Sequence, residues 1–147
     1  MGEIIQIGIA KLKHSPIDSV ELIEVVTGKG IKGDRKFQDN NAKDQQLTLI
    51  ESENIDYYNK KYNSNFSYLD FRRNLITKNI RLNDLVGKTI FIGEVKAKGI
   101  DLCRPCKELE EKLQATNYLK EFLRSGGLRC EILTTGSIKV EDKISIL

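Results

Sequence analysis

The sequence predicts a mainly β protein, a closed antiparallel β-barrel with a few helical insertions. Short β-branched runs recur along the chain, turn residues separate these runs, and few stretches have helical spacing. A chain of 147 residues has the length of about one domain and can bury a substantial core. It contains no repeat, low-complexity tract or linker, so we expect a single domain over residues 1–147.

The first part of the chain is expected to form strands joined by a glycine-rich loop. Residues 3–12 are rich in isoleucine and residues 20–26 in valine and isoleucine, which favours strands. Three glycines mark residues 27–37 as a loop whose backbone bends tightly or approaches a ligand closely. Residues 45–50 predict another strand, and residues 51–63 have the apolar spacing of a short helix.

The second part adds strands on either side of a helical region. Residues 71–80 and 88–100 alternate β-branched and polar side chains, which predicts two strands. A helix is expected from residue 105, and residues 117–127 continue helically to a pair of glycines. Residues 128–147 predict a strand, a turn at a glycine and a final strand.

Composition narrows the class of protein. The 24 basic and 21 acidic side chains leave a net charge of +3, which is mild, and no nucleic-acid partner is expected. Residues 1–10 lack the basic start of a signal peptide, and no apolar run approaches the roughly 18 residues of a membrane span. We therefore expect a cytoplasmic protein without a membrane association. An odd number of cysteines in a reducing compartment favours free, catalytic or metal-binding thiols over disulfides.

Two of the three cysteines lie close together where a strand gives way to a helix. Cys103 and Cys106 flank a proline, and proline is tolerated in the first turn of a helix, which places Cys106 in that turn. Unpaired N–H groups and the positive end of the helix dipole stabilise an anion there. Arg104 and Lys107 add positive charge, so the sequence favours a reactive thiolate.

Several interpretations of these thiols stay open from the residues alone. They include two ordinary half-buried cysteines, a thioredoxin-like dithiol and a soft thiolate that binds metal or carries sulfur. A thioredoxin dithiol normally follows an early strand, which counts against it here. A zinc site would need Cys103, Cys106, Cys130 and His14, yet structural zinc sites usually offer two closely spaced pairs. His14 is expected to be an ordinary loop residue.

An ordered set of motifs resembles the MOSC domain, the family named after the C-terminal domain of molybdenum-cofactor sulfurases. The motifs are "GIKGDRKF", "QQLTLI", "DFRRNLITKNI", "GIDLCRPCKELEEKL" and "GGLRCEILTTGSIKVEDKI". The resemblance implies a β-barrel with helical insertions. It also implies a link to the molybdenum cofactor, because the best-known members bind or sulfurate this cofactor or use it to reduce N-hydroxylated compounds.

The resemblance implies roles for individual residues. Cys106 would be the thiolate ligand of molybdenum or the carrier of a persulfide, and Cys103 would be a supporting or resolving thiol. The implied cofactor-binding residues are Gly33, Asp34, Arg35, Lys36, Arg72, Arg73 and Asn74. Guanidinium groups suit this role because the molybdenum cofactor (molybdopterin) carries an anionic phosphate that a planar fork binds bidentately. Lys36 stands where short relatives usually have histidine, and Cys130 is expected to be a core thiol.

The expected function is therefore a molybdenum-cofactor-binding module that handles sulfur through Cys106. The alternative is a small molybdenum-dependent reductase of N-hydroxylated compounds. Either function implies separate partners: a cysteine-desulfurase-type sulfur donor or an electron-transfer protein, and a molybdoenzyme that accepts the sulfur or cofactor.

Overall fold

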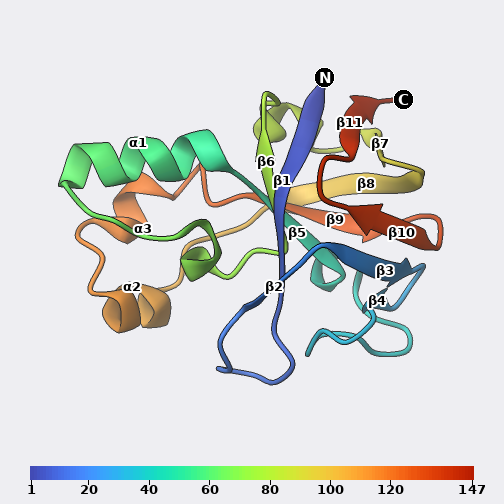
Figure 1. Cartoon of the computed structure of the whole chain (residues 1–147), viewed down its shortest axis with the longest axis horizontal. Helices are drawn as coiled ribbons and strands as arrows, with labels where there is room; N and C mark the ends of the chain where they lie inside the picture. Colours follow the sequence, from blue (N-terminus) through green and yellow to red (C-terminus); the bar gives the residue numbers. More distant parts are fainter.

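The computed structural model describes all 147 residues and contains two β-sheets and several short helices (Figure 1). The strands are β1 (Gly2–Ile9), β2 (Asp18–Val20), β3 (Leu22–Val26), β4 (Gly30–Ile31), β5 (Leu47–Glu51), β6 (Leu75–Lys78), β7 (Thr89–Ile92), β8 (Val95–Leu102), β9 (Leu128–Ile132), β10 (Gly136–Lys139) and β11 (Lys143–Ile146). The α-helices are α1 (Ser52–Tyr62), α2 (Lys107–Leu113) and α3 (Tyr118–Glu121), and the 3₁₀ turns are η1 (Lys43–Gln45), η2 (Tyr68–Phe71) and η3 (Leu82–Leu85).

The larger sheet closes on itself, which confirms the predicted barrel. Its strand order is β11-β7-β8-β9-β5-β6-β1, and β1 pairs back onto β11 through Gly2 and Glu3. β2 pairs with β1 outside this closure, while β10, β3 and β4 form the smaller sheet. All pairings around the barrel are antiparallel except β5 with β6. That pair is parallel because α1 and η2 carry the chain back to the starting end of β5 before β6 begins.

Two apolar clusters hold the fold together. A cluster of 19 buried residues, mostly isoleucine, leucine and valine from the strands, fills the barrel. A second cluster of 9 lies between the barrel and the helices, with Tyr58, Phe71, Tyr118 and Phe122 at its centre. The rings of Phe71 and Tyr118 stack with centroids 5.7 Å apart. Each fully buried side chain of this size contributes about 1.5–3 kcal/mol to stability.

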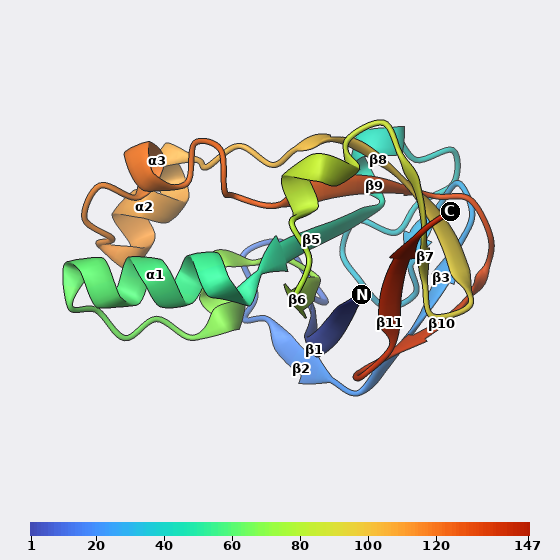
Figure 2. The same cartoon turned by 90° about the horizontal axis from the view of Figure 1, so that it is seen from above.

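The helices gather at one side of the barrel rather than around it (Figures 1 and 2). The aromatic cluster ties α1, η2, α2 and α3 together there. None of the helices is long and apolar enough to cross a membrane.

Local details differ from the sequence prediction at three places. The expected strand 88–100 is a hairpin of β7 and β8 with its turn at Gly93, and Gly136 begins β10 instead of making a turn. The expected helix 117–127 ends early, because α3 has a single turn and the chain continues to Gly126 in turns. Tertiary packing decides these boundaries, since short apolar runs fit either one long strand or a hairpin.

Gly127, at the end of the segment predicted to be helical, fixes the path of the chain into β9. Gly127 has φ +116°, and an added Cβ would clash with the carbonyl oxygen of Leu49 on β5. We expect Gly127→Ala to lower the free energy of unfolding by about 3 kcal/mol, because both backbone strain and a backbone clash oppose it. Gly28 has φ +75° with open space around it, so Gly28→Ala should cost only about 1 kcal/mol. Urea denaturation of both variants measures the difference, and equal losses would contradict this explanation.

Candidate functional site

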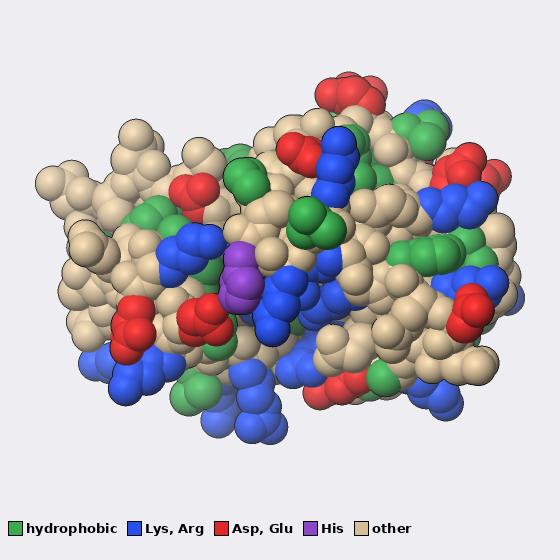
Figure 3. Space-filling model, turned by 90° about the horizontal axis from the view of Figure 1, so that it is seen from below, with side chains coloured by type: hydrophobic (Ala, Val, Ile, Leu, Met, Phe, Trp, Pro, Cys, Tyr) green, Lys and Arg blue, Asp and Glu red, His purple; other side chains and the backbone are tan.

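A pocket of about 220 Å³ opens where the helical side meets the barrel. Its walls come from the β1–β2 loop, the loop after β4, the start of β5, the segment before β6, and α2. The lining residues are Ala10, Lys13, His14, Ile17, Asp34, Arg35, Lys36, Gln45, Gln46, Leu47, Thr48, Arg72, Arg73, Asn74, Cys106, Glu108, Leu109 and Lys112. The space-filling view shows basic side chains gathered beside the single histidine on this face (Figure 3).

Cys106 is the only cysteine in the pocket wall, and its side chain is exposed. The helix begins two residues later than predicted, so Cys106 is the N-cap of α2 and not part of its first turn, with extended backbone angles of φ −111° and ψ 146°. Its Sγ accepts a hydrogen bond from the backbone N–H of Leu109 at 3.3 Å. A sulfur held this way has a donor that stabilises negative charge and an open side toward the pocket. Arg104 and Lys107, expected to supply charge, do not line the pocket.

Cys103 and Cys130 are both buried, and neither lines the pocket. Burial raises the pKa of the Cys103 thiol, against the opposing effect of the Arg73 and Arg129 charges. Burial also raises the pKa of Cys130, which is part of the barrel core as expected. All three cysteines are free thiols. The structure therefore keeps Cys103 apart from the solvent-accessible surface on which a resolving thiol would act.

Brief alkylation of the native protein tests this difference in exposure. We expect iodoacetamide to modify Cys106 and to leave Cys103 and Cys130 unmodified, because the thiolate is the reacting form and both buried thiols resist ionisation. Peptide mass spectrometry after a short reaction identifies the labelled residue. In urea all three should react, and early labelling of Cys103 in the native state would contradict its burial.

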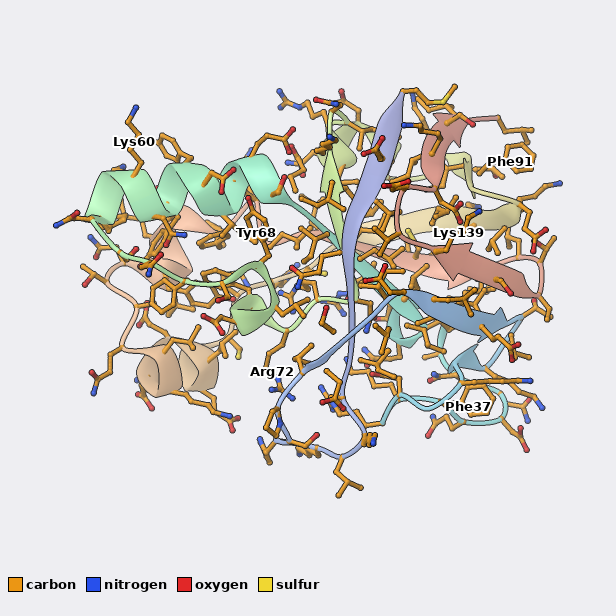
Figure 4. All side chains as sticks on the ribbon, viewed as in Figure 1. Phe37, Lys60, Tyr68, Arg72, Phe91 and Lys139 are labelled. Atoms are coloured by element: carbon orange, nitrogen blue, oxygen red, sulfur yellow. The ribbon has the colours of Figure 1, made fainter.

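Arg72 lines the pocket and has an unusual backbone conformation (Figure 4). It ends η2 in the left-handed region with φ 63° and ψ 32°, a conformation that costs a non-glycine residue about 1–2 kcal/mol. Its Nη2 is buried and has no hydrogen-bond partner. Burial lowers the pKa of this guanidinium, and the neighbouring Arg35 charge lowers it further. A strained arginine with a buried, unpartnered donor is a candidate for binding an anion.

Arg73 and Asn74 follow Arg72 directly, and their side chains make different hydrogen bonds. The Nε of Arg73 donates to the carbonyl of Gly126 at 2.9 Å, which fixes the guanidinium at the pocket wall. The Asn74 amide joins strands instead. Its Oδ1 accepts from the N–H and Oγ1 of Thr48, and its Nδ2 donates to the carbonyl of Gly8. Asn74 thus borders the pocket with most of its hydrogen-bonding capacity already used.

The loop after β4 brings two more cations to the pocket. Asp34 pins this loop, because its carboxylate accepts hydrogen bonds from the backbone N–H groups of Ala10 and Lys36. Arg35 is held through its own N–H, which donates to the Ala10 carbonyl. Arg35 and Lys36 line the pocket, whereas Gly33 supplies only a left-handed turn with φ +86°. Burial lowers the pKa of Lys36, and the charges of Arg35 and Arg73 lower it further.

The lowered pKa of Lys36 predicts how stability depends on pH. Below the native pKa both states hold the proton, and the native state carries the full cost of the buried charge. Between that lowered pKa and the ordinary value of 10.5 only the unfolded state keeps the proton, so stability rises with pH. We expect Lys36→Gln to raise stability at pH 7 by the order of 0.5 kcal/mol, allowing for solvent screening, and to flatten this rise. Urea denaturation as a function of pH measures it, with the exposed Lys98→Gln as control.

The family of this chain follows from its sequence pattern together with this geometry. The pattern of the MOSC domain matches residues 32–145. The chain belongs to the MOSC family. This family is associated with the molybdenum cofactor and with sulfur-related functions. No curated protein matches the sequence.

Solved structures of MOSC-type proteins share the whole fold. YuaD from Bacillus subtilis superposes with a TM-score of 0.84 at 17% identity, covering 98% of this chain and 94% of that chain. YiiM from Geobacillus stearothermophilus gives a TM-score of 0.81 at 18% identity, covering 100% of this chain and 75% of that chain. YiiM from Escherichia coli gives 0.77 at 16% identity, with 100% and 70% covered. At these identities the likeness establishes the fold.

Charge is concentrated in the pocket of this MOSC domain. Six lining residues are cationic, namely Lys13, Arg35, Lys36, Arg72, Arg73 and Lys112, against the two carboxylates Asp34 and Glu108. The lining thus carries a net charge of +4, although the whole chain carries only +3. None of the six cations takes part in an ion pair, while other surface lysines and arginines do. A site with this excess is suited to an anion with several charged oxygens.

The donor set fits a cofactor held by its anionic group rather than a metal held by protein ligands alone. No group of three or more histidine, cysteine or carboxylate side chains is arranged around a common point. The four residues of the zinc interpretation do not meet, because Cys130 lies in the barrel core, Cys103 is buried outside the pocket, and only Cys106 and His14 line the pocket. Cys106 is the one soft ligand at the pocket.

Sequence reasoning missed three residues at the mouth of the pocket. Lys13 and His14 reach it from the β1–β2 loop, and Lys112 reaches it from α2. The Nδ1 of His14 lies 3.7 Å from Oε1 of Glu108, so the loop and the helix meet across the opening. The only sequence signal for Lys13 and His14 was the short basic stretch at residues 11–14, which looks like an ordinary exposed loop.

Proposed function

We propose that this MOSC protein binds the molybdenum cofactor in the pocket and handles sulfur through Cys106. One observation carries the proposal: the single exposed cysteine lines a pocket whose lining also holds six cations without ion-pair partners. A thiolate and an anion-binding surface within one pocket are what sulfur transfer to a phosphorylated ligand requires.

Arg72 and Arg73 would hold the phosphate of the cofactor. Each guanidinium offers a planar fork of donors, and Arg72 has a buried donor without an acceptor. Arg73 is fixed by its bond to Gly126, so less side-chain freedom is lost on binding. Arg35 and Lys36 would add charge from the opposite loop. Asn74 and Asp34 would act as positioning residues, because their hydrogen bonds already join the strands and loops that form the walls.

Cys106 would act in one of two closely related ways. As a carrier it would hold sulfur as a persulfide, and the Leu109 N–H would stabilise the sulfur when it is an anion. As a ligand it would present the same soft thiolate to molybdenum, which the cofactor supplies when bound. In both cases Cys103 supports the backbone at the end of β8 and does not take part, since it is buried and its N–H donates to Gly127.

The proposal includes protein partners. A persulfide on Cys106 needs a source of sulfur, for which we propose a cysteine-desulfurase-type donor, and a molybdoenzyme as the acceptor.

A second hollow supports the alternative function of a small molybdenum-dependent reductase. It has a volume of about 340 Å³ and shares His14, Ile17, Arg72, Leu109 and Lys112 with the first pocket. Its remaining wall is largely apolar. A substrate bound there would lie beside a cofactor in the first pocket, an arrangement that a reductase needs and a carrier does not.

Analysis of the purified protein separates the two functions. The protein is produced in cells that make the cofactor, and its pterin, molybdenum and cyanide-labile sulfur are measured. Labile sulfur on Cys106 that moves to added cofactor favours the carrier. Stoichiometric pterin-bound molybdenum with reduction of an N-hydroxylated compound, given an electron donor, favours the reductase. Absence of cofactor binding at saturating concentrations would overturn both.

A further inference from the structure

Resting on the proposed function, we propose that sulfur from the desulfurase-type donor reaches Cys106 on a small anionic persulfide that carries a carboxylate. Such a molecule would place its carboxylate among the cations of the pocket and its sulfur next to Cys106.

The positive charge lies in the pocket interior as well as at its rim. Lys36, Arg72 and Arg73 are half-buried lining residues, so a ligand must enter the pocket to reach them. Asp34 offsets only part of this charge, because one carboxylate faces three cations. The volume of about 220 Å³ is several times that of a water molecule, about 30 Å³, and accepts a short organic anion.

The outer surface next to Cys106 does not share the positive excess of the pocket interior. The exposed side chains there have both signs, with Glu108 and Glu111 beside Arg104, Lys107 and Lys112. Glu110 faces α3, where its Oε2 accepts a hydrogen bond from the N–H of Leu119. A protein surface that covers this mixed rim does not reach the half-buried cations, whereas a small anion enters the pocket and reaches them.

The sulfur transfer is balanced and needs no oxidant or reductant. The Cys106 thiolate attacks the terminal sulfur of the donor R–S–SH, and the bond between the two donor sulfurs breaks as the new S–S bond forms. The products are the Cys106 persulfide and the thiolate R–S⁻, so the number of protons and the total oxidation state are unchanged. The pocket cations stabilise the negative charge of both donor and leaving thiolate.

The test compares persulfides that differ in charge. The persulfides of 3-mercaptopropionate, 2-mercaptoethanol and cysteamine provide an anion, a neutral molecule and a cation. Rates of Cys106 persulfidation are followed by intact-protein mass spectrometry and divided by the rates with N-acetylcysteamine, an uncharged thiol, which removes the intrinsic reactivity of each donor. We expect the anion to be favoured over the cation by about tenfold at low salt, and the preference to shrink as salt increases.

Variants test whether the pocket cations cause the preference for the anionic persulfide. Lys36→Gln and Arg35→Gln should each reduce it about threefold, because each removes one unpaired cation. Glu108→Gln should increase it, because a carboxylate leaves the mouth. Lys60→Gln is the matched control, since Lys60 is exposed on α1, far from Arg72 (Figure 4). Equal normalised rates for the three donors, or a preference unchanged in both pocket variants, would overturn the proposal.

A second measurement distinguishes failure of this inference from failure of the proposed function. Loaded protein is given the cofactor, and transfer of the labelled sulfur is measured. Preference for the anion without later transfer would leave this inference standing and overturn the carrier function. If only a purified cysteine desulfurase loads Cys106, and the sulfur is then transferred to the cofactor, the carrier function would stand and this inference would be overturned.

Discussion

Replacing Cys106 by serine is expected to remove all cyanide-labile sulfur from the protein while leaving the pocket able to bind the cofactor. Cys106 is the one exposed thiol, and no other cysteine lines the pocket. Serine keeps the N-cap of α2, because its hydroxyl accepts a hydrogen bond from the helix as well as sulfur does. The fold should therefore be retained within about 1 kcal/mol. Sulfur is measured by cyanolysis and cofactor binding by fluorescence titration.

Cys103→Ser is the matched control for this experiment. It removes a thiol only three positions away, but that thiol is 3% exposed and packs near Gly127. We expect it to keep the labile sulfur on Cys106 and to lose about 1–3 kcal/mol of stability, because a hydroxyl is buried without a partner. Labile sulfur that survives in Cys106→Ser, or disappears equally in Cys103→Ser, would show that Cys106 is not the carrier.

Arg72→Gly is expected to make the protein more stable and the cofactor bind more weakly. Glycine adopts the left-handed conformation without strain, which relieves about 1–2 kcal/mol, and a buried unpartnered donor disappears. The greater freedom of glycine in the unfolded chain returns about 0.5–1 kcal/mol, so the net gain is about 1 kcal/mol. Loss of charge-assisted hydrogen bonds, each about 1.5–3 kcal/mol, should weaken binding by about tenfold to a hundredfold.

Two comparisons separate the effect of Arg72 on stability from its effect on cofactor binding. Arg72→Lys keeps the charge and the strain but loses the planar fork, so it should bind with intermediate affinity and gain no stability. Inorganic phosphate titrated against each variant isolates the contribution of the phosphate group. A decrease in stability for Arg72→Gly, or cofactor binding equal to that of the unchanged protein, would contradict the role that we assign to Arg72.

Much of the fold could be predicted because strands and turns leave local signals. β-branched runs gave the barrel class, and the stretch around Pro105 gave the start of α2 to within two residues. These local signals failed where the arrangement of a strand depends on how it pairs with another segment. A continuous apolar run could not reveal the hairpin at Gly93. The helix predicted between residues 45–50 and 71–80 was the one sign that β5 and β6 pair in parallel, and the prediction of an antiparallel barrel did not use it.

Most members of the candidate site could be predicted, but their arrangement could not. The arginines, Lys36 and Cys106 all line one pocket, while Cys103 is buried and Asn74 is engaged in joining strands. Spacing alone made Cys103 and Cys106 look like a working pair. The tight path of the chain over Gly126 and Gly127 sends one thiol inward and leaves the other at the surface.

The sequence by itself determined the architecture class and the side chains with chemical potential, because β-branched patterning and a cysteine before a helix act through near neighbours. Only the tertiary structure decided which of these side chains meet. Closure of β1 onto β11 and the return of the chain through α1 bring the β1–β2 loop, Arg72 and α2 to one pocket. The concentration of +4 there, in a chain of +3, depends on contacts between segments far apart in sequence, which no local pattern encodes.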